Sequence, residues 1–205
     1  MLDHIVYAVP DVAKAVADLE QRLGVRAAFG GKHPGIGTHN ALLSLSDDSY
    51  MEIIGPDPDQ PPPAMPRPFG IDMLKAPRLV TWLAKARNFE EQLGRVRALG
   101  YNPGTLTPMS RDLPDGTRIE WRLAIPPQPI GDGLVPVLIE WHTDRHPAKT
   151  SPRGCTLVEL YGEHPRPETV RSILDAMGVS LDLRQGPVPT LTAILDTPKG
   201  RVTLR

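Results

Sequence analysis

The feature that most constrains the fold is one order of predicted elements that occurs three times along the 205 residues. Each cycle begins with a short apolar strand, continues through a capping residue and an amphipathic helix, and closes with further strands. Asp11 can cap a helix over 12–23, and Asn88 can cap one over 89–99. Such a repeated pattern predicts duplication of one structural unit.

The three cycles set the predicted domain boundaries. Residues 1–57 and 78–145 are each expected to form a βαβββ unit, the second with a hairpin turn over 114–116. Residues 58–77 are rich in proline, which cannot donate to a strand ladder or continue a helix, so they are expected to be a linker. Residues 154–205 are predicted to be a third, shorter βαβ-type unit.

Composition excludes several classes of function. A net charge of −1 gives no electrostatic basis for binding nucleic acid or an anionic membrane surface. No apolar run reaches the length of a membrane span, and the N-terminus lacks the pattern of a signal peptide, so a cytoplasmic location is expected. The single cysteine, Cys155, allows no internal disulfide and is expected to be a small buried residue.

Side-chain alternation along three strands predicts a site. His4 lies on the strand face opposite to Ile5 and Tyr7, and Glu52 and Glu140 alternate with apolar neighbours in the same way. If the apolar faces pack under helices, these three polar side chains point together into the opposite, concave side. A buried carboxylate is costly unless it is paired or bound to a metal, so the three residues predict a site for a divalent cation.

An ordinary polar cluster is the alternative to a metal. Each glutamate could pair with an arginine such as Arg122, and His4 could hydrogen-bond one of them. Asn40 shares the inward face and could bind a substrate or satisfy backbone groups. Arg122 could clamp a substrate carboxylate or form an ion pair, and His142, on the face of Glu140, could also contact a ligand.

The remaining aromatic and histidine side chains are assigned to structural positions. Trp82, Trp121 and Trp141 are expected on the faces that pack under helices. His33 and His39 are expected to be loop or surface residues.

Several stretches together resemble the vicinal oxygen chelate superfamily, in its glyoxalase-like branch, with an additional C-terminal module. They are LDHIVYAVPD, HPGIGTHNALLSL, YMEIIGPDP, TRIEWRLAIPP and VPVLIEW. The resemblance implies an α+β fold in which repeated βαβββ units form a curled mixed sheet around a cleft, with helices on the outer face. It also implies metal ligands on the first and last strand of each unit, which fall on His4, Glu52, Thr81 and Glu140. Thr81 departs from the pattern because a neutral hydroxyl is a poor ligand.

The resemblance implies a metal-dependent isomerase or lyase acting on a small substrate with adjacent oxygens. One divalent cation (Zn, Ni, Mn or Fe) would chelate the substrate, and Glu140 or Glu52 would act as the base. The alternative is a metal-free small-molecule binding or drug-sequestering protein of the same fold, which Thr81 favours. An interaction module using an edge strand is a third interpretation, and a homodimer is expected because small sheets leave edges to cover.

Overall fold

The structure is a computed structural model that describes residues 1–112 and 116–205, and the turn expected over 114–116 therefore lies partly outside the described residues. Its elements follow the predicted order. The first repeat contains β1 (Leu2–Ala8), α1 (Val12–Leu23), β2 (Ala28–His33), β3 (Thr38–Ser44) and β4 (Tyr50–Pro56). The second contains β5 (Arg78–Lys85), α2 (Phe89–Ala98), β6 (Thr107–Asp112), β7 (Arg118–Ala124) and β8 (Val137–Trp141).

Short helices connect these repeats to each other and to a C-terminal unit. The 3-10 helix η1 (Pro68–Met73) lies in the proline-rich stretch between the repeats. The 3-10 helix η2 (Ile130–Gly133) precedes β8, and α3 (Pro147–Thr150) follows it. The C-terminal unit contains β9 (Thr156–His164), α4 (Pro167–Met177), β10 (Asp182–Gln185), β11 (Thr190–Thr197) and β12 (Gly200–Leu204).

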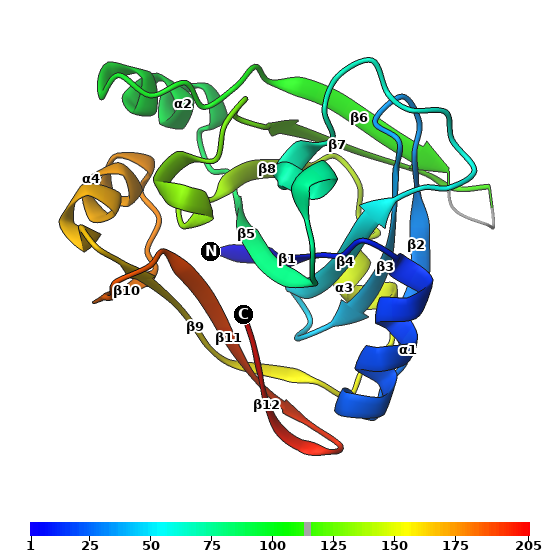
Figure 1. Cartoon of the computed structure of the whole chain (residues 1–205). Helices are drawn as coiled ribbons and strands as arrows, with labels where there is room; N and C mark the ends of the chain where they lie inside the picture. The colour runs from blue at the N-terminus through cyan, green and yellow to red at the C-terminus, as the bar shows by residue number, and fades with distance from the viewer. Residues whose placement is uncertain (113–115) are drawn as a thin grey trace.

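The two repeats build one eight-stranded sheet with the order β2-β3-β4-β1-β5-β8-β7-β6. Within the repeats β1 runs parallel to β4 and β5 parallel to β8, while the antiparallel pair β1 and β5 joins the two halves. The sheet curls until it is nearly closed, which brings β2 and β6 near each other although they occupy opposite ends of the order (Figure 1). The predicted α+β fold, with a curled mixed sheet around a cleft, is confirmed.

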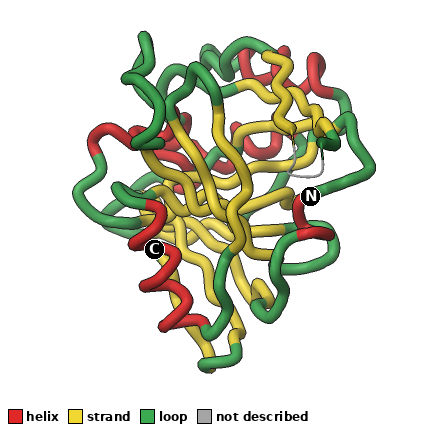
Figure 2. Tube along the Cα trace, turned by 90° about the vertical axis from the view of Figure 1, so that its right-hand side faces the viewer, coloured by secondary structure: helices red, strands yellow, loops and turns green. Residues whose placement is uncertain are grey.

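The long helices α1 and α2 pack on the outer face of the large sheet, as predicted, whereas α3 and η1 pack on its concave side. Figure 2 shows the helices around the strands. The Asp11 side chain accepts a hydrogen bond from the Lys14 backbone N–H at 2.9 Å, so the predicted cap of α1 is confirmed. Asn88 occupies the N-cap position of α2, as predicted, but its side chain makes no cap bond to the helix backbone. Instead the Gln92 side-chain oxygen reaches back to the backbone N–H of Arg87 at 2.9 Å.

The C-terminal unit shares the order of elements but not the strand pairing of the two repeats. Its separate sheet has the order β10-β9-β11-β12, with β10 parallel to β9. The unit packs on the helix side of the large sheet, where Gln92 donates from Nε2 to the backbone oxygen of Met177 at 2.6 Å. The first two cycles therefore form one kind of unit and the third another.

Two apolar clusters lie on the two faces of the large sheet. The larger cluster packs under the helices and includes Trp82, which donates from Nε1 to the Leu134 backbone oxygen at 2.9 Å. The smaller cluster lies on the concave face and includes Trp121, with Trp141 packed against it. The prediction for Trp82 is confirmed, whereas Trp121 and Trp141 lie on the face opposite to the one expected. None of the helices in the described part of the chain is long and apolar enough to cross a membrane.

Candidate functional site

A β-bulge at the start of β1 places two polar side chains next to each other. Leu2 pairs with Ala84 and His4 with the adjacent Leu83, so Asp3 is the extra residue of the bulge. The bulge brings Asp3 beside His4, with 2.7 Å between Asp3 Oδ1 and His4 Nδ1. Both side chains are buried.

Asp3 contacts the Nδ1 side of the His4 ring and positions it. Its second oxygen, Oδ2, accepts hydrogen bonds from His146 Nε2 at 2.9 Å and from Trp141 Nε1 at 3.1 Å. Burial alone would raise the pKa of Asp3, but the hydrogen bonds from His146 and His4 hold it well below its usual range. The carboxylate is therefore charged, and it fixes the orientation of the His4 ring.

Glu52 of β4 faces the other nitrogen of His4. The distance between His4 Nε2 and Glu52 Oε2 is 3.6 Å, and Asn40 Nδ2 donates to Glu52 Oε1 at 2.5 Å. Burial would lower the pKa of His4, but Asp3 and Glu52 raise it to about 9. Burial would likewise raise the pKa of Glu52, but His4 and Asn40 lower it to about 2. At neutral pH the pair is an imidazolium beside a carboxylate.

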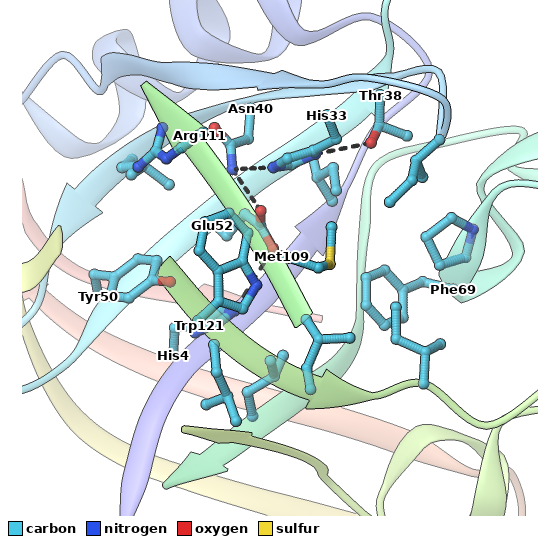
Figure 3. A pocket seen from close by; sticks show the side chains of 18 of the residues that line it. His4, His33, Thr38, Asn40, Tyr50, Glu52, Phe69, Met109, Arg111 and Trp121 are labelled. Carbon is cyan, nitrogen blue, oxygen red and sulfur yellow. Dashed lines mark hydrogen bonds and ion pairs between the residues drawn. The ribbon is translucent and has the colours of Figure 1, made fainter. Parts of the chain in front are cut away.

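A chain of polar groups continues from Glu52 along β3 and the end of β2. His33 Nε2 lies 3.4 Å from Asn40 Nδ2, and His33 Nδ1 lies 2.9 Å from Thr38 Oγ1 (Figure 3). Burial lowers the pKa of His33. His33 therefore lines the pocket as a neutral side chain, contrary to the expectation that it is a loop or surface residue.

Arg111 reaches the same pocket from β6, across the near-closure of the sheet. Its Nη1 is buried and has no hydrogen-bond partner within 1–112 and 116–205, and the same holds for Asn40 Oδ1. A Cβ atom added at Gly31 of β2 would lie 2.6 Å from Arg111 Nη1, so the missing side chain leaves room for the guanidinium. A buried donor without a partner costs free energy, which an anionic ligand would recover.

These groups form the polar end of a cavity whose other walls are apolar. Its free volume is about 70 Å³. The Tyr50 ring stacks on His4 with 4.4 Å between ring centroids, and it covers one side of the imidazole. The apolar walls include Ile54, Phe69, Leu83, Met109, Trp121, Leu123, Ile139 and Trp141.

The predicted residues of β7 and β8 lie elsewhere. Glu140 accepts from Arg122 Nε at 2.8 Å and lies 2.8 Å from His142 Nε2, on the outer face, where Arg122 also lies 3.8 Å from Glu90 of α2. The expectation that Glu140 and His142 share the face of His4 and Glu52 is therefore wrong. For Arg122, the alternative of an ion pair with a glutamate is confirmed, and Glu140 is the partner. Side chains alternate with a period of two, and in β8 it is Ile139 and Trp141 that line the cavity.

The strand register shows which residues of the second repeat match the site. Across β1 and β5, His4 pairs with Leu83 and Val6 with Thr81, so a pseudo-two-fold axis relates His4 to Thr81 and Val6 to Leu83. Val6 pairs with Glu52 on β4, and Leu83 pairs with Val137 on β8. Val137, and not Glu140, therefore occupies the position equivalent to Glu52.

The same axis relates the two bulges. Thr81 pairs with Val6 and Leu79 with Tyr7, so Val80 is the extra residue of a second bulge, as Asp3 is of the first. The polar set Asp3, His4 and Glu52 thus has Val80, Thr81 and Val137 as its counterparts.

The donor set does not fit the three-ligand metal site that the sequence predicts. Within the described ranges, no group of three His, Cys, Asp or Glu side chains is arranged to hold a metal ion. The two nearest candidates, His4 and Glu52, pair with each other, and the matching positions carry Thr81 and Val137. The positive charge of Arg111 faces the same cavity and opposes a cation there.

Comparisons with known proteins agree with this fold. A family model described as a glyoxalase-like domain matches residues 2–178. A solved structure of a hypothetical protein from Staphylococcus aureus has a TM-score of 0.66 at 12% identity and covers 98% of this chain and 83% of that one. At this identity the similarity shows the fold alone.

Two epimerase structures are more distant. The methylmalonyl-CoA epimerase of Mycobacterium tuberculosis has a TM-score of 0.40 at 17% identity, covering 68% of this chain and 85% of that one. A variant of the Streptomyces coelicolor methylmalonyl-CoA epimerase, in complex with 2-nitronate-propionyl-CoA, has a TM-score of 0.44 at 16% identity, covering 70% and 95%. No curated protein sequence matches the chain.

Proposed function

The chain belongs to the glyoxalase-like domain family, and from this premise we propose that its pocket binds a small organic anion with adjacent oxygens and transfers a proton on it. One observation carries the proposal: a buried His4–Glu52 ion pair lines one largely apolar cavity together with Nη1 of Arg111, which has no hydrogen-bond partner among the described residues. Arg111 binds the negative charge of the ligand, and the ion pair provides an acid and a base.

His4 is the group that donates to a ligand oxygen. Asp3 occupies Nδ1, so the proton on Nε2 is the one directed at Glu52 and the cavity. The 3.6 Å distance to Glu52 is longer than an ordinary N–H···O hydrogen bond. A carbonyl oxygen of the ligand therefore competes well for this proton.

Ligand binding then changes the basicity of Glu52. The interaction with His4 is what holds the pKa of Glu52 low, whereas burial acts to raise it. When a ligand oxygen accepts the hydrogen bond from His4 Nε2, His4 interacts less strongly with Glu52. The effect of burial then prevails, and the pKa of Glu52 rises toward the range of an effective base. The ligand itself thus activates the base.

The proton transfer balances without a co-reactant. Glu52 removes a proton from the carbon next to the ligand carbonyl, and the C–H electron pair becomes the new C=C bond as the carbonyl oxygen takes the negative charge. His4 and Arg111 stabilise that charge. With a 2-hydroxy ketone, return of the proton from Glu52 to the former carbonyl carbon, as the hydroxyl proton moves to the former carbonyl oxygen, completes an isomerisation.

Exchange of carbon-bound hydrogen in D₂O tests this proposal. With a panel of 2-oxo acids and 2-hydroxy ketones, we expect NMR to show loss of the C–H signal next to the carbonyl. Glu52→Gln should slow the exchange by about 10²-fold or more. Glu120→Gln is the matched control, because Glu120 is an exposed glutamate of β7. Equal exchange rates in Glu52→Gln and the wild type would contradict the role of Glu52.

Binding without chemistry is the second candidate function. Thr81 and Val137 favour it, because the second repeat adds no titratable group at the matching positions. Saturable binding of the panel without hydrogen exchange would support this sequestering function over the isomerase.

The divalent cation expected from the sequence has its own test. Metal analysis of protein purified without a chelator would support that cation if it found stoichiometric metal that a His4→Ala variant loses. The homodimer and the cytoplasmic location expected from the sequence stay predictions.

A further inference from the structure

We propose that the ligand has two parts, an anionic head bound at Arg111 and an apolar tail that occupies a second cavity on the half of the concave face built by the second repeat. The identity of the head site rests on the proposed function. The tail site rests on a separate set of residues.

The second cavity is larger and is apolar. Its free volume is about 530 Å³, against about 70 Å³ for the pocket at His4. The counterparts of the polar set, Val80, Thr81 and Val137, all line it. It is therefore the pseudo-symmetric equivalent of the first pocket, with the charged groups replaced.

The cavity offers no free charge to a ligand. Among the described residues that line it, Arg67 is the only charged one. Arg67 Nη1 pairs with Asp72 at 2.6 Å, and its Nε donates to the Gly37 backbone oxygen at 2.7 Å. A hydrocarbon or aromatic group would fit these walls, whereas a second anionic or strongly polar group would be left without partners.

The two cavities are adjacent. Four residues line both of them: Ile36, Pro68, Phe69 and Ile125. Figure 3 shows Phe69 on the side of the first pocket away from Arg111 and Tyr50. Phe69 has φ 62°, a left-handed conformation that is unfavourable for a residue other than glycine, so the chain holds this ring at the boundary against a local cost.

The volumes explain why the ligand extends toward Phe69. One water needs roughly 10–15 Å³ on the same measure, so about 70 Å³ accommodates only a few non-hydrogen atoms. That is enough for a carboxylate and an adjacent carbonyl. A longer ligand has to leave this pocket, and the boundary at Phe69 leads to the cavity whose walls are apolar.

A chain-length series of 2-oxo acids tests the tail site, from pyruvate through 2-oxohexanoate to 2-oxodecanoate. Isothermal titration calorimetry should show the affinity rising by about fourfold per methylene before a plateau. Arg111→Met should weaken every member by a similar factor of roughly ten to a hundred. Val137→Phe, which places a ring inside the second cavity, should reduce the gain with chain length and leave pyruvate binding unchanged.

Two further variants keep the test decisive. Val158→Phe is the matched control, because Val158 is an exposed valine of β9 in the other sheet and should keep the chain-length gain. Met65→Trp alters an exposed residue that lines the second cavity, and it decides the question if Val137→Phe does not fold.

The outcomes separate this inference from the proposed function. If pyruvate binds through Arg111 but longer chains bind no more tightly, the tail site is wrong and the proposed function stands. If affinity rises with chain length as steeply in both Val137→Phe and Met65→Trp as in the wild type, the tail lies elsewhere and the inference is overturned. If no member of the series binds, both proposals fail.

Discussion

The two halves of the concave face have the same strand pairing and opposite chemistry. Asp3, His4 and Glu52 in the first repeat correspond by register to Val80, Thr81 and Val137 in the second. Both halves retain the apolar outer face, because that face packs under helices and supplies most of the hydrophobic burial. The concave face lines cavities instead, so its side chains can differ between repeats without disturbing the packing under the helices. Duplication of one βαβββ unit thus provides a polar cavity and an apolar one.

Replacing the positively charged His4 of the polar half should have the largest effect on stability. His4→Leu leaves the carboxylates of Asp3 and Glu52 buried without their shared imidazolium, and it should lower the free energy of unfolding by about 3–5 kcal/mol. The matched change in the other half, Thr81→Val, should cost less than about 1 kcal/mol, because Thr81 makes one long hydrogen bond of 3.4 Å. Urea unfolding at pH 7 measures both. Similar small losses in the two variants would show that the halves do not differ in this way.

The polar half should also determine the pH dependence of stability. His4 has its pKa raised from 6.5 to about 9, so its contribution is complete below pH 6.5 and is lost as the pH rises through 9. Glu52 has its pKa lowered from 4.5 to about 2, so its contribution is present above pH 4.5 and is lost as the pH falls through 2. The free energy of unfolding should therefore decline above pH 6.5 by at most about 1.4 kcal/mol per pH unit.

The control for this pH dependence is again His4→Leu, in which the decline on the alkaline side should be absent. Urea unfolding at intervals from pH 6 to 9.5 provides the comparison. A decline of equal slope in His4→Leu and in the wild type would assign it to other groups.

Adding metal-ligand side chains to the apolar half should have a smaller effect on stability, and this effect should depend on metal. The double variant Thr81→His with Val137→Glu places ligand-type side chains at the positions that match His4 and Glu52. Without metal the added buried carboxylate should lower the melting temperature. Zn²⁺ should then restore stability, by about 2.7 kcal/mol at a hundred times its dissociation constant. If Zn²⁺ stabilises the wild type to the same extent, the native side chains around His4 and Glu52 already bind a metal.

Local sequence signals were enough for the elements and for half of the site. The helix over 12–23 and its Asp11 cap follow from apolar spacing and side-chain hydrogen bonding, which act within a few residues. The inward positions of His4, Asn40 and Glu52 follow from alternation along strands whose opposite faces are apolar. Thr81 as the counterpart of His4 agrees with the register between β1 and β5.

Other parts of the site depend on how strands meet, which local patterns do not encode. The side-chain orientation of β8 is the clearest case. A shift of one residue in the register of a strand exchanges its two faces, and the register of β8 turns Glu140 outward. The bulge that brings Asp3 to His4 inserts one residue against the partner strand, so alternation within β1 could not indicate it. Arg111 shares a strand face with Met109 in β6, yet only the curl of the sheet brings β6 to the pocket.

The sequence by itself determined the order of strands and helices, the duplicated unit and the inward polar residues of the first repeat, because each depends on neighbours along the chain. The tertiary structure alone decided which side chains of the second repeat face the cavity, that Arg111 and His33 join Glu52 there, and that an apolar cavity lies beside the polar one. The physical reason is that strand register and sheet closure are set by packing between distant segments, whose combined burial outweighs the preference of any single strand.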